Sequence, residues 1–198
     1  SITFVGFILP ISTTYFVRTY STNSAGTSYG NEISFTTNQV TAPTLTTAAV
    51  SSITQTSAIS GGNVTSNGEA PIVARGVCWN TSSNPSTANS KTTDVTGVGS
   101  YTSLLTGLAA GTTYFVRSYA INSVGTSYGN EISFSTRPVT LPVLTTTEAS
   151  FITQTTATCG GTITSDGGAP ILIRGVRYSL SGTFNSVVKI TDGTGTGS

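Results

Sequence analysis

The feature that most constrains the fold of this chain is an internal repeat. Residues 13–37, TTYFVRTYSTNSAGTSYGNEISFTT, return at 112–136 as TTYFVRSYAINSVGTSYGNEISFST, and twenty of the twenty-five positions are identical. Each copy is typical of two β-strands around a short turn. At an offset of 99 residues the chain aligns with itself over 1–83, so the 198 residues contain two periods of a unit of about a hundred residues. A unit of that size can bury a core of its own.

The composition favours strands and excludes several classes of function. Val, Ile, Leu, Tyr and Phe supply most of the apolar residues and lie between Gly and Asn clusters, which predicts an all-β protein with almost no helix. Only 8% of the residues are charged and the formal net charge is +1, so no basic surface for nucleic acid or an anionic membrane is present. The sequence has no His, and it has neither a phosphate-binding loop motif nor a run of alternating carboxylates. We therefore expect no enzymatic activity, no metal and no cofactor.

Seven short strands are expected between the two proline-containing connectors at 38–43 and 137–142, because proline cannot donate to a β-ladder. Seven is the number of strands in an immunoglobulin-like sandwich. The expected ranges are 44–50, 56–65, 72–81, 90–95, 100–106, 112–122 and 126–136. Small or apolar residues recur at every second position of these ranges, which predicts the side of each strand that faces the core. The core candidates are Ala58, Ser60, Gly62, Val64, Tyr114, Val116, Ile132 and Phe134, and their counterparts Tyr15, Val17, Ile33, Phe35, Ala157, Cys159, Gly161 and Ile163.

A family resemblance is carried by the run Leu108-x-x-Gly-Thr-Thr-Tyr-x-Val-Arg-x-Tyr-x-x-Asn-Ser-x-Gly. It resembles the end of a fibronectin type III domain, where a leucine, a tight turn and a tyrosine open the sixth strand. Together with ARGVCWN at 74–80 and SDGGAP at 165–170, the chain is similar to tandem repeats of that class in secreted and surface-anchored bacterial proteins. The resemblance covers nearly the whole chain and implies an extracellular location, but it implies no particular ligand. The chain departs from the family in placing Trp79 on the third strand instead of the second.

The expected domain boundaries divide the chain into 1–38, 39–138 and 139–198. The middle part is expected to be a complete sandwich, the first part to hold the last three strands of another, and the last part to hold the first four. Each partial sandwich would expose an apolar face and open strand edges, which favours association. Because the chain has no initiator Met, we also expect it to be a processed or excised piece of a longer one.

The two partial sandwiches are complementary in the repeat alignment, so the tail of one copy and the head of another would complete one domain. Such a head-to-tail contact does not close on itself and therefore gives a filament. Two routes lead to it, covalent continuation in a longer array and strand donation between separate chains.

Residues 1–12, SITFVGFILPIS, are far more apolar than the equivalent internal segment 100–111, SYTSLLTGLAAG. A strand that holds two chains together needs this apolar area, since four or five buried large side chains contribute on the order of 10 kcal/mol before association entropy is subtracted. The alternatives are ordinary divergence of an intramolecular strand and the core of a signal peptide. The predicted strand between copies and its acceptor face comprise Ile2, Phe4, Val5, Phe7, Ile8, Leu9, Ile11, Ala157, Cys159 and Ile163.

A second candidate site is a strip of aromatic and arginine side chains on the opposite face of the repeated hairpin. Such a strip could bind sugar rings or form cation–π contacts, and the alternative is that its members are cross-strand pairs that stabilise the sheet. The strip comprises Phe16, Arg18 and Tyr20, repeated as Phe115, Arg117 and Tyr119.

The two cysteines are not a pair that is repeated in each unit, so the sequence predicts no structural disulfide within each domain. We expect the Cys78 thiol to be buried or covered by a partner, with an intermolecular disulfide as the alternative, and Cys159 to pack in a core. O-glycosylation of the Thr-rich surface is consistent with an extracellular location, but the pattern selects no residue.

The sequence thus predicts a non-enzymatic extracellular structural repeat protein that forms a filament, a fimbria-like fibre or an adhesin stalk. Its main partner would be another copy of itself, bound head to tail, with glycans or other surface ligands as additional candidates. The alternative hypothesis is a spacer or carbohydrate-binding accessory module of a secreted polysaccharide-degrading enzyme.

Overall fold

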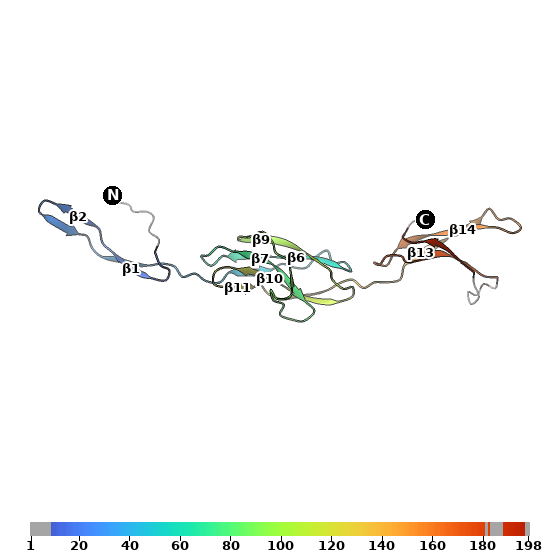
Figure 1. Cartoon of the computed structure of the whole chain (residues 1–198), viewed down its shortest axis with the longest axis horizontal. Coiled ribbons are helices and arrows are strands. Elements are labelled where there is room, and N and C mark those ends of the chain that lie inside the picture. The colour runs from blue at the N-terminus through green and yellow to red at the C-terminus, as the bar shows by residue number, and fades with distance from the viewer. Residues whose placement is uncertain (1–8, 181, 183–187, 197–198) are drawn as a thin grey trace. The chain divides into compact units, whose positions relative to one another are not determined.

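The computed structural model describes residues 9–180, 182 and 188–196. Within these residues the regular structure consists of β-strands, with no helix, as the composition predicts. Figure 1 shows the strands in order along the chain. The internal contacts of the chain divide it into two compact units. The first contains the residues up to Ser52 together with Ala58–Leu105 and Tyr114–Phe134, and the second contains Ile53–Ser57, Thr106–Thr113 and the residues from Ser135.

Eight strands build one complete β-sandwich, which we call the central sandwich. One sheet has the order β5-β6-β9, and the other has the order β11-β10-β7-β8 with β12 also paired to β10. The strands are β5 (Thr44–Thr47), β6 (Ser57–Ser66), β7 (Ala74–Asn80), β8 (Ser90–Lys91), β9 (Gly99–Thr106), β10 (Thr113–Ile121), β11 (Thr126–Tyr128) and β12 (Ile132–Ser135). The predicted fold class, all-β with a sandwich of antiparallel strands, is confirmed, and every predicted range overlaps a strand.

The core of the central sandwich lies between its two sheets. Val64 on β6 and Ala120 on β10 pack together with Ile72, and Leu45 and Tyr101 cover this cluster. Side chains from both sheets therefore contribute, as the period-2 alternation requires. Further fully buried side chains include Ala58, Val77, Cys78, Leu105 and Val116.

The last predicted strand, 126–136, is split into β11 and β12. The break lies at Gly129, whose backbone N–H donates to the carbonyl of Ser118 over 2.9 Å. A Cβ atom on Gly129 would collide with Ser118 and Thr47, so only glycine fits at this close approach. Strand β8 is also shorter than predicted, because the Thr92 hydroxyl replaces a backbone carbonyl and accepts the N–H of Val77 over 2.9 Å.

Four strands precede the central sandwich and form two small antiparallel sheets, which we call the head hairpin. Strand β1 (Thr14–Val17) pairs with β4 (Ile33–Thr36), and β2 (Tyr20–Asn23) pairs with β3 (Gly26–Tyr29). Tyr15 lies opposite Phe35, and Tyr20 lies opposite Tyr29.

Four further strands follow the central sandwich and form the tail. Strand β13 (Val143–Ser150) pairs with β14 (Thr158–Ser165), and β15 (Arg174–Tyr178) pairs with β16 (Val188–Gly193). These are the first four strands of the repeat unit, just as the head hairpin contains its last strands. The predicted boundaries at 38 and 138 stay a prediction for independently folding domains.

Candidate functional site: two exposed core faces

The head hairpin has the same internal contacts as the closing hairpin of the central sandwich. Tyr15 stacks on Phe35 with ring centroids 5.6 Å apart and an interplanar angle of 26°, and Tyr114 stacks on Phe134 at 5.9 Å and 24°. These aromatic pairs lie on the side of the strands that faces the core in the central sandwich. The local sequence therefore produces one geometry in two different surroundings.

The two arginines of the repeat also make matching contacts. Arg18 Nε donates to the Gly30 carbonyl over 3.1 Å, and its guanidinium carbon lies 5.2 Å from the centre of the Tyr29 ring. Arg117 makes the equivalent hydrogen bond, to the Gly129 carbonyl, over 3.0 Å, and lies 4.7 Å from the ring of Tyr128. These bonds link neighbouring strands, which is what the sheet-stabilising alternative for this strip expects.

The burial of the two hairpins differs although their contacts agree. Phe35 is 45% exposed and Val17 is 43% exposed, whereas the equivalent Phe134 and Val116 are 7% and 0% exposed. In the central sandwich β5, β6 and β9 form the sheet that covers this face. In the head hairpin the described residues provide no such cover, so an aromatic and aliphatic face meets solvent.

The tail repeats the strand pairing of the first half of the central sandwich. Leu144 on β13 lies opposite Ile163 on β14, as Leu45 lies opposite Val64, and both ladders have a bulge at the preceding residue. The second pair of tail strands keeps the register too, because Arg177 lies opposite Lys189 as Cys78 lies opposite Lys91.

The core face of the tail is exposed as well. Leu144 is 61% exposed and Ile163 is half-buried, whereas Val64, the counterpart of Ile163, is buried. Val176 is half-buried, and its counterpart Val77 is fully buried. The head hairpin and the tail thus present the two complementary halves of one sandwich core, each on the surface of the unit that carries it.

The predicted inter-copy residues fall into three groups. Ile2, Phe4, Val5, Phe7 and Ile8 lie outside the described residues. Leu9 is half-buried and Ile11 is exposed, and on the acceptor side Ala157 and Cys159 are exposed and Ile163 is half-buried. Accessible acceptor residues are compatible with docking, but pairing between copies stays a prediction.

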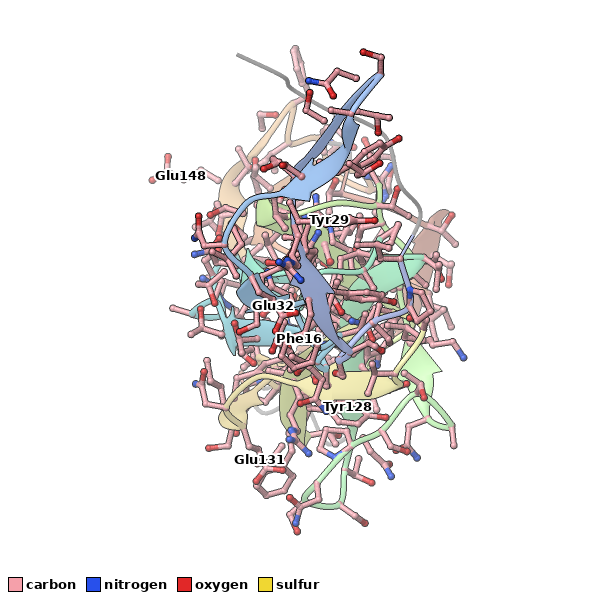
Figure 2. The ribbon with its side chains drawn as sticks, turned by 90° about the vertical axis from the view of Figure 1, so that its left-hand side faces the viewer. Phe16, Tyr29, Glu32, Tyr128, Glu131 and Glu148 are labelled. Atoms are coloured by element: carbon pink, nitrogen blue, oxygen red, sulfur yellow. The ribbon has the colours of Figure 1, made fainter. Side chains whose placement is uncertain are left out.

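The aromatic strip is exposed in the head hairpin only. Phe16, Arg18 and Tyr20 are exposed, as is Tyr29 on β3, and Figure 2 labels Phe16 and Tyr29 on the head hairpin. In the central sandwich Phe115 and Arg117 are half-buried.

Tyr119 is buried, so its assignment to a surface strip is wrong. The segment after β8 covers it, and the Tyr119 hydroxyl donates to the carbonyl of Thr92 over 2.6 Å. Tyr20 is the counterpart of Tyr119, and no described segment covers it as residues 92–94 cover Tyr119. Its exposure is therefore not by itself a sign of a sugar-binding surface.

The two thiols occupy opposite environments. Cys78 is fully buried, which confirms the prediction of a buried thiol, and burial raises its pKa from 9.0 to about 11. Cys159 is exposed, so the prediction that it packs in a core is wrong for the single chain. Its counterpart Ser60 is 2% exposed, and the difference arises because β14 lacks the neighbouring strands and opposite sheet that cover β6.

A polar cluster that joins the buried Thr47 and Ser118 to the exposed Asn130 was not predicted from the sequence. The backbone N–H of Thr47 donates to Asn130 Oδ1 over 3.0 Å, and the Thr47 hydroxyl accepts the backbone N–H of Ser118 over 3.0 Å. The prediction treats 126–136 as one continuous strand, whereas Asn130 lies in the break between β11 and β12. The repetition of Gly-Asn-Glu at 30–32 and 129–131 is the only signal in the sequence that points to it.

The described part of the chain contains no group of three or more His, Cys, Asp or Glu side chains that could hold a metal ion. It also contains no helix that is long and apolar enough to cross a membrane.

No family model and no curated protein matches this chain. Among solved structures, it is similar to a structure described as a myokine, with 18% identity, a TM-score of 0.37, and coverage of 50% of this chain and 99% of the other. It is similar to the sensor domain of the anti-sigma factor RsgI4 of Pseudobacteroides cellulosolvens, with 19% identity, a TM-score of 0.38 and the same coverage. It is also similar to the FN1–FN3 domains of chicken CNTN1, with 20% identity, a TM-score of 0.38, and coverage of 66% of this chain and 45% of the other. At these scores the likenesses carry no argument, and the sandwich fold stands on the sheets and the core of the chain itself.

Proposed function

We propose that this chain is a non-enzymatic, extracellular structural repeat protein whose copies join head to tail by completing a split β-sandwich. The head hairpin of one copy supplies the closing strands, and the tail of another copy supplies the first four. Repetition of this joint gives a filament, a fimbria-like fibre or an adhesin stalk, because a head-to-tail contact does not close on itself.

The observation that carries the proposal is that the two copies of the repeated hairpin have the same internal contacts but different burial. The stacked pair Tyr15–Phe35 has nearly the geometry of Tyr114–Phe134, yet Phe35 is 45% exposed where Phe134 is 7% exposed. Formation of the hairpin therefore does not depend on its cover, while burial of its apolar face does. The tail exposes the matching face, with the strand register of the sheet that would cover it.

The energetics favour completion. Val17, Ile33 and Phe35 on the head hairpin and Leu144 on the tail are large apolar side chains that are exposed in the single chain. Each contributes about 1.5 to 3 kcal/mol on going from full exposure to full burial. Because about half of each side chain is already buried, these four together contribute about 3 to 6 kcal/mol before association entropy is subtracted. Open edges of β13, β14 and β15 add an independent tendency to pair with further strands.

Mechanically, such a fibre transmits tension through sandwiches that alternate between two kinds. One kind is the central sandwich, formed within a copy, and the other is the joint sandwich, formed between copies. The carbohydrate-binding alternative gains no specific support, because the exposed aromatic residues of the head hairpin include Tyr20, whose counterpart is covered in the central sandwich.

The thiol of Cys159 provides a direct test. It is exposed in the single chain, whereas Ser60 at the same position of the complete sandwich is buried. We expect Cys159 to react readily with a maleimide in dilute chain and to become protected as the concentration rises and fibres appear in negative-stain electron microscopy. The buried Cys78 is the internal control and should stay unreactive throughout.

Denaturing electrophoresis of native material separates the two routes to the joint. Strand donation predicts that the fibres dissociate into single chains, and covalent continuation predicts a ladder or one much longer chain. A chain that stays monomeric at all concentrations, with Cys159 always reactive and no longer covalent form, would contradict head-to-tail completion.

A further inference from the structure

Two polar links join the first half of the central sandwich to its closing hairpin. In the first, Thr47 on β5 is held by Asn130 and Ser118: the Thr47 N–H donates to Asn130 Oδ1 over 3.0 Å, and the Thr47 hydroxyl accepts the Ser118 N–H over 3.0 Å. Thr47 and Ser118 are both buried. Buried hydrogen bonds of this kind permit one register, because a shift by one residue would leave each donor without an acceptor.

The second link lies at the other end of the same hairpin. Asn122 Nδ2 donates to the carbonyl of Thr41 over 2.7 Å and to the carbonyl of Asn67 over 2.9 Å. Asn122 is buried, and its Oδ1 accepts the N–H of Val124 over 2.9 Å, which fixes the orientation of the carboxamide. The side chain thus clamps the connector that enters β5 against the turn that follows β6.

The head hairpin carries the hairpin half of both links. Asn31 and Asn23 occupy the positions of Asn130 and Asn122, and both are exposed. The local geometry is already in place, since Asn23 Oδ1 accepts the N–H of Ala25 over 2.8 Å in the way that Asn122 Oδ1 accepts that of Val124.

The tail carries the other half. Thr146 lies opposite Gly161 on β14, as Thr47 lies opposite Gly62 on β6, and Thr146 is exposed. The Thr140 N–H donates to the Gly167 carbonyl over 2.9 Å, in the same way that the N–H of Thr41 donates to that of Gly68 over 2.8 Å. The carbonyl of Thr140 therefore has the local position of the Thr41 carbonyl, which accepts a hydrogen bond from the Asn122 side chain, and it can accept one from an equivalent asparagine.

A glycine on β14 leaves room for one more strand. In the central sandwich a Cβ on Gly61 would collide with the Tyr101 carbonyl oxygen, because β9 is the next strand of the same sheet and its backbone passes close beside this residue. In the tail, a Cβ on the equivalent Gly160 would meet, among the described residues, only the hydroxyl of Thr147, at 4.0 Å. No described strand therefore lies beside Gly160, where β9 lies beside Gly61 in the central sandwich.

We propose that a second copy of this chain docks on the tail in a single register, which is set by Asn31 and Asn23 of its head hairpin. Asn31 Oδ1 accepts the N–H of Thr146, Asn23 Nδ2 donates to the carbonyl of Thr140, and the edge of β14 at Gly160 pairs with a strand of the incoming copy. This inference rests on the proposed head-to-tail function and adds to it the contacts that select the partner.

Asn31→Ala and Asn23→Ala test the polar links. Each leaves a buried donor or acceptor without a partner in the joint, so we expect the concentration needed for assembly, measured by sedimentation and by Cys159 protection, to rise about tenfold to a hundredfold. Both asparagines lie outside the central sandwich, so the urea midpoint followed through its only tryptophan, Trp79, should not move. The matched variant Asn130→Ala should do the reverse and lower that midpoint with little effect on assembly.

Gly160→Ala tests the strand beside β14 without removing a hydrogen bond. The new methyl group fits the single chain, yet it should block assembly. Thr164→Ala on the same strand should assemble like the parent chain, because its counterpart Thr65 stays exposed in the central sandwich. If the parent chain assembles and protects Cys159 while Asn31→Ala, Asn23→Ala and Gly160→Ala assemble equally well, the proposed register is wrong and head-to-tail completion stands. If the parent chain itself fails to assemble, the proposed function fails and the register with it.

Discussion

Phe35 and Phe134 occupy equivalent positions in the two copies of the hairpin and have the same local geometry, but we expect them to stabilise different parts of the protein. Both rings stack on a tyrosine at 5.6 to 5.9 Å. Only Phe134 is part of a completed core, so replacing each phenylalanine by alanine separates the stability of the central sandwich from that of the joint between copies. We expect Phe134→Ala to lower the stability of the central sandwich and Phe35→Ala to weaken assembly.

The structure gives the expected magnitudes. Phe134 is 7% exposed, and truncating such a buried ring costs about 3 to 5 kcal/mol of unfolding free energy. Phe35 is 45% exposed in the single chain, so completion to the burial of Phe134 removes roughly two-fifths of a ring area of about 200 Å². At about 25 cal/mol per Å² this is about 2 kcal/mol for the joint, or about a thirtyfold loss in the association constant.

The two effects have separate assays. Trp79 is the only tryptophan of the chain and lies on β7, opposite Val116, so its fluorescence reports unfolding of the central sandwich in urea. Sedimentation velocity over a concentration series reports assembly. If Phe35→Ala shifts the Trp79 transition as far as Phe134→Ala does, or leaves the assembly concentration unchanged, the reasoning from split burial is refuted.

Three further predictions concern the central sandwich. Gly61→Ala should lower its unfolding free energy by about 1 to 3 kcal/mol, since the added methyl group collides with the Tyr101 carbonyl of β9. A urea midpoint equal to that of the parent chain would contradict the close approach. Because burial raises the pKa of Cys78 from 9.0 to about 11, the folded state favours the neutral thiol. The contribution of Cys78 to stability should therefore be constant below pH 9 and fall as the pH rises from 9 towards 11. The Cys78→Ala variant should lose part of this fall, and an identical pH profile would count against the assignment. Arg75→Leu should lower the thermal midpoint, because Arg75 donates to two glycine carbonyls at 2.7 and 3.1 Å and lies 4.6 Å from the Tyr101 ring, and an unchanged midpoint would show that these contacts contribute nothing.

The positions of the strands were predictable because they depend on short-range patterns. Alternating apolar residues along β6 and β10, and prolines in the connectors, fix where strands run and which side faces the core. Glycines with special surroundings were not predictable, since the split at Gly129 follows from contacts with Thr47 and Ser118 that are distant in the sequence.

The environments of single side chains were predictable only where alternation decides them. Tyr119 lies on the same side of β10 as the half-buried Arg117, yet the segment at 92–94 covers it. Cys159 has the core-facing position of Ser60, but its burial requires strands that the described tail does not contain. For both residues the strand was predicted correctly, and the predicted burial was wrong because it depends on which segment covers the strand. A repeat alignment does not show which segment that is.

The substitutions between the two copies of the hairpin bear on how the joint sandwich differs from the central one. Ala120 is fully buried against Val64, whereas the head hairpin has Ser21 at this position and the tail has the larger Ile163 opposite it. A serine hydroxyl in a closed core needs a hydrogen-bond partner, so this substitution weakens the joint, while the extra methylene of isoleucine adds apolar area. The two changes oppose each other, and the face of the tail alone cannot make the joint stronger than the central sandwich. Under the proposed completion, further apolar area has to come from outside these two faces. Residues 1–7 lie outside the described residues, and their sequence has Ile2 and Phe4 where the internal copy has Tyr101 and Ser103. This segment is therefore the one whose composition adds the apolar area that a contact between separate chains requires.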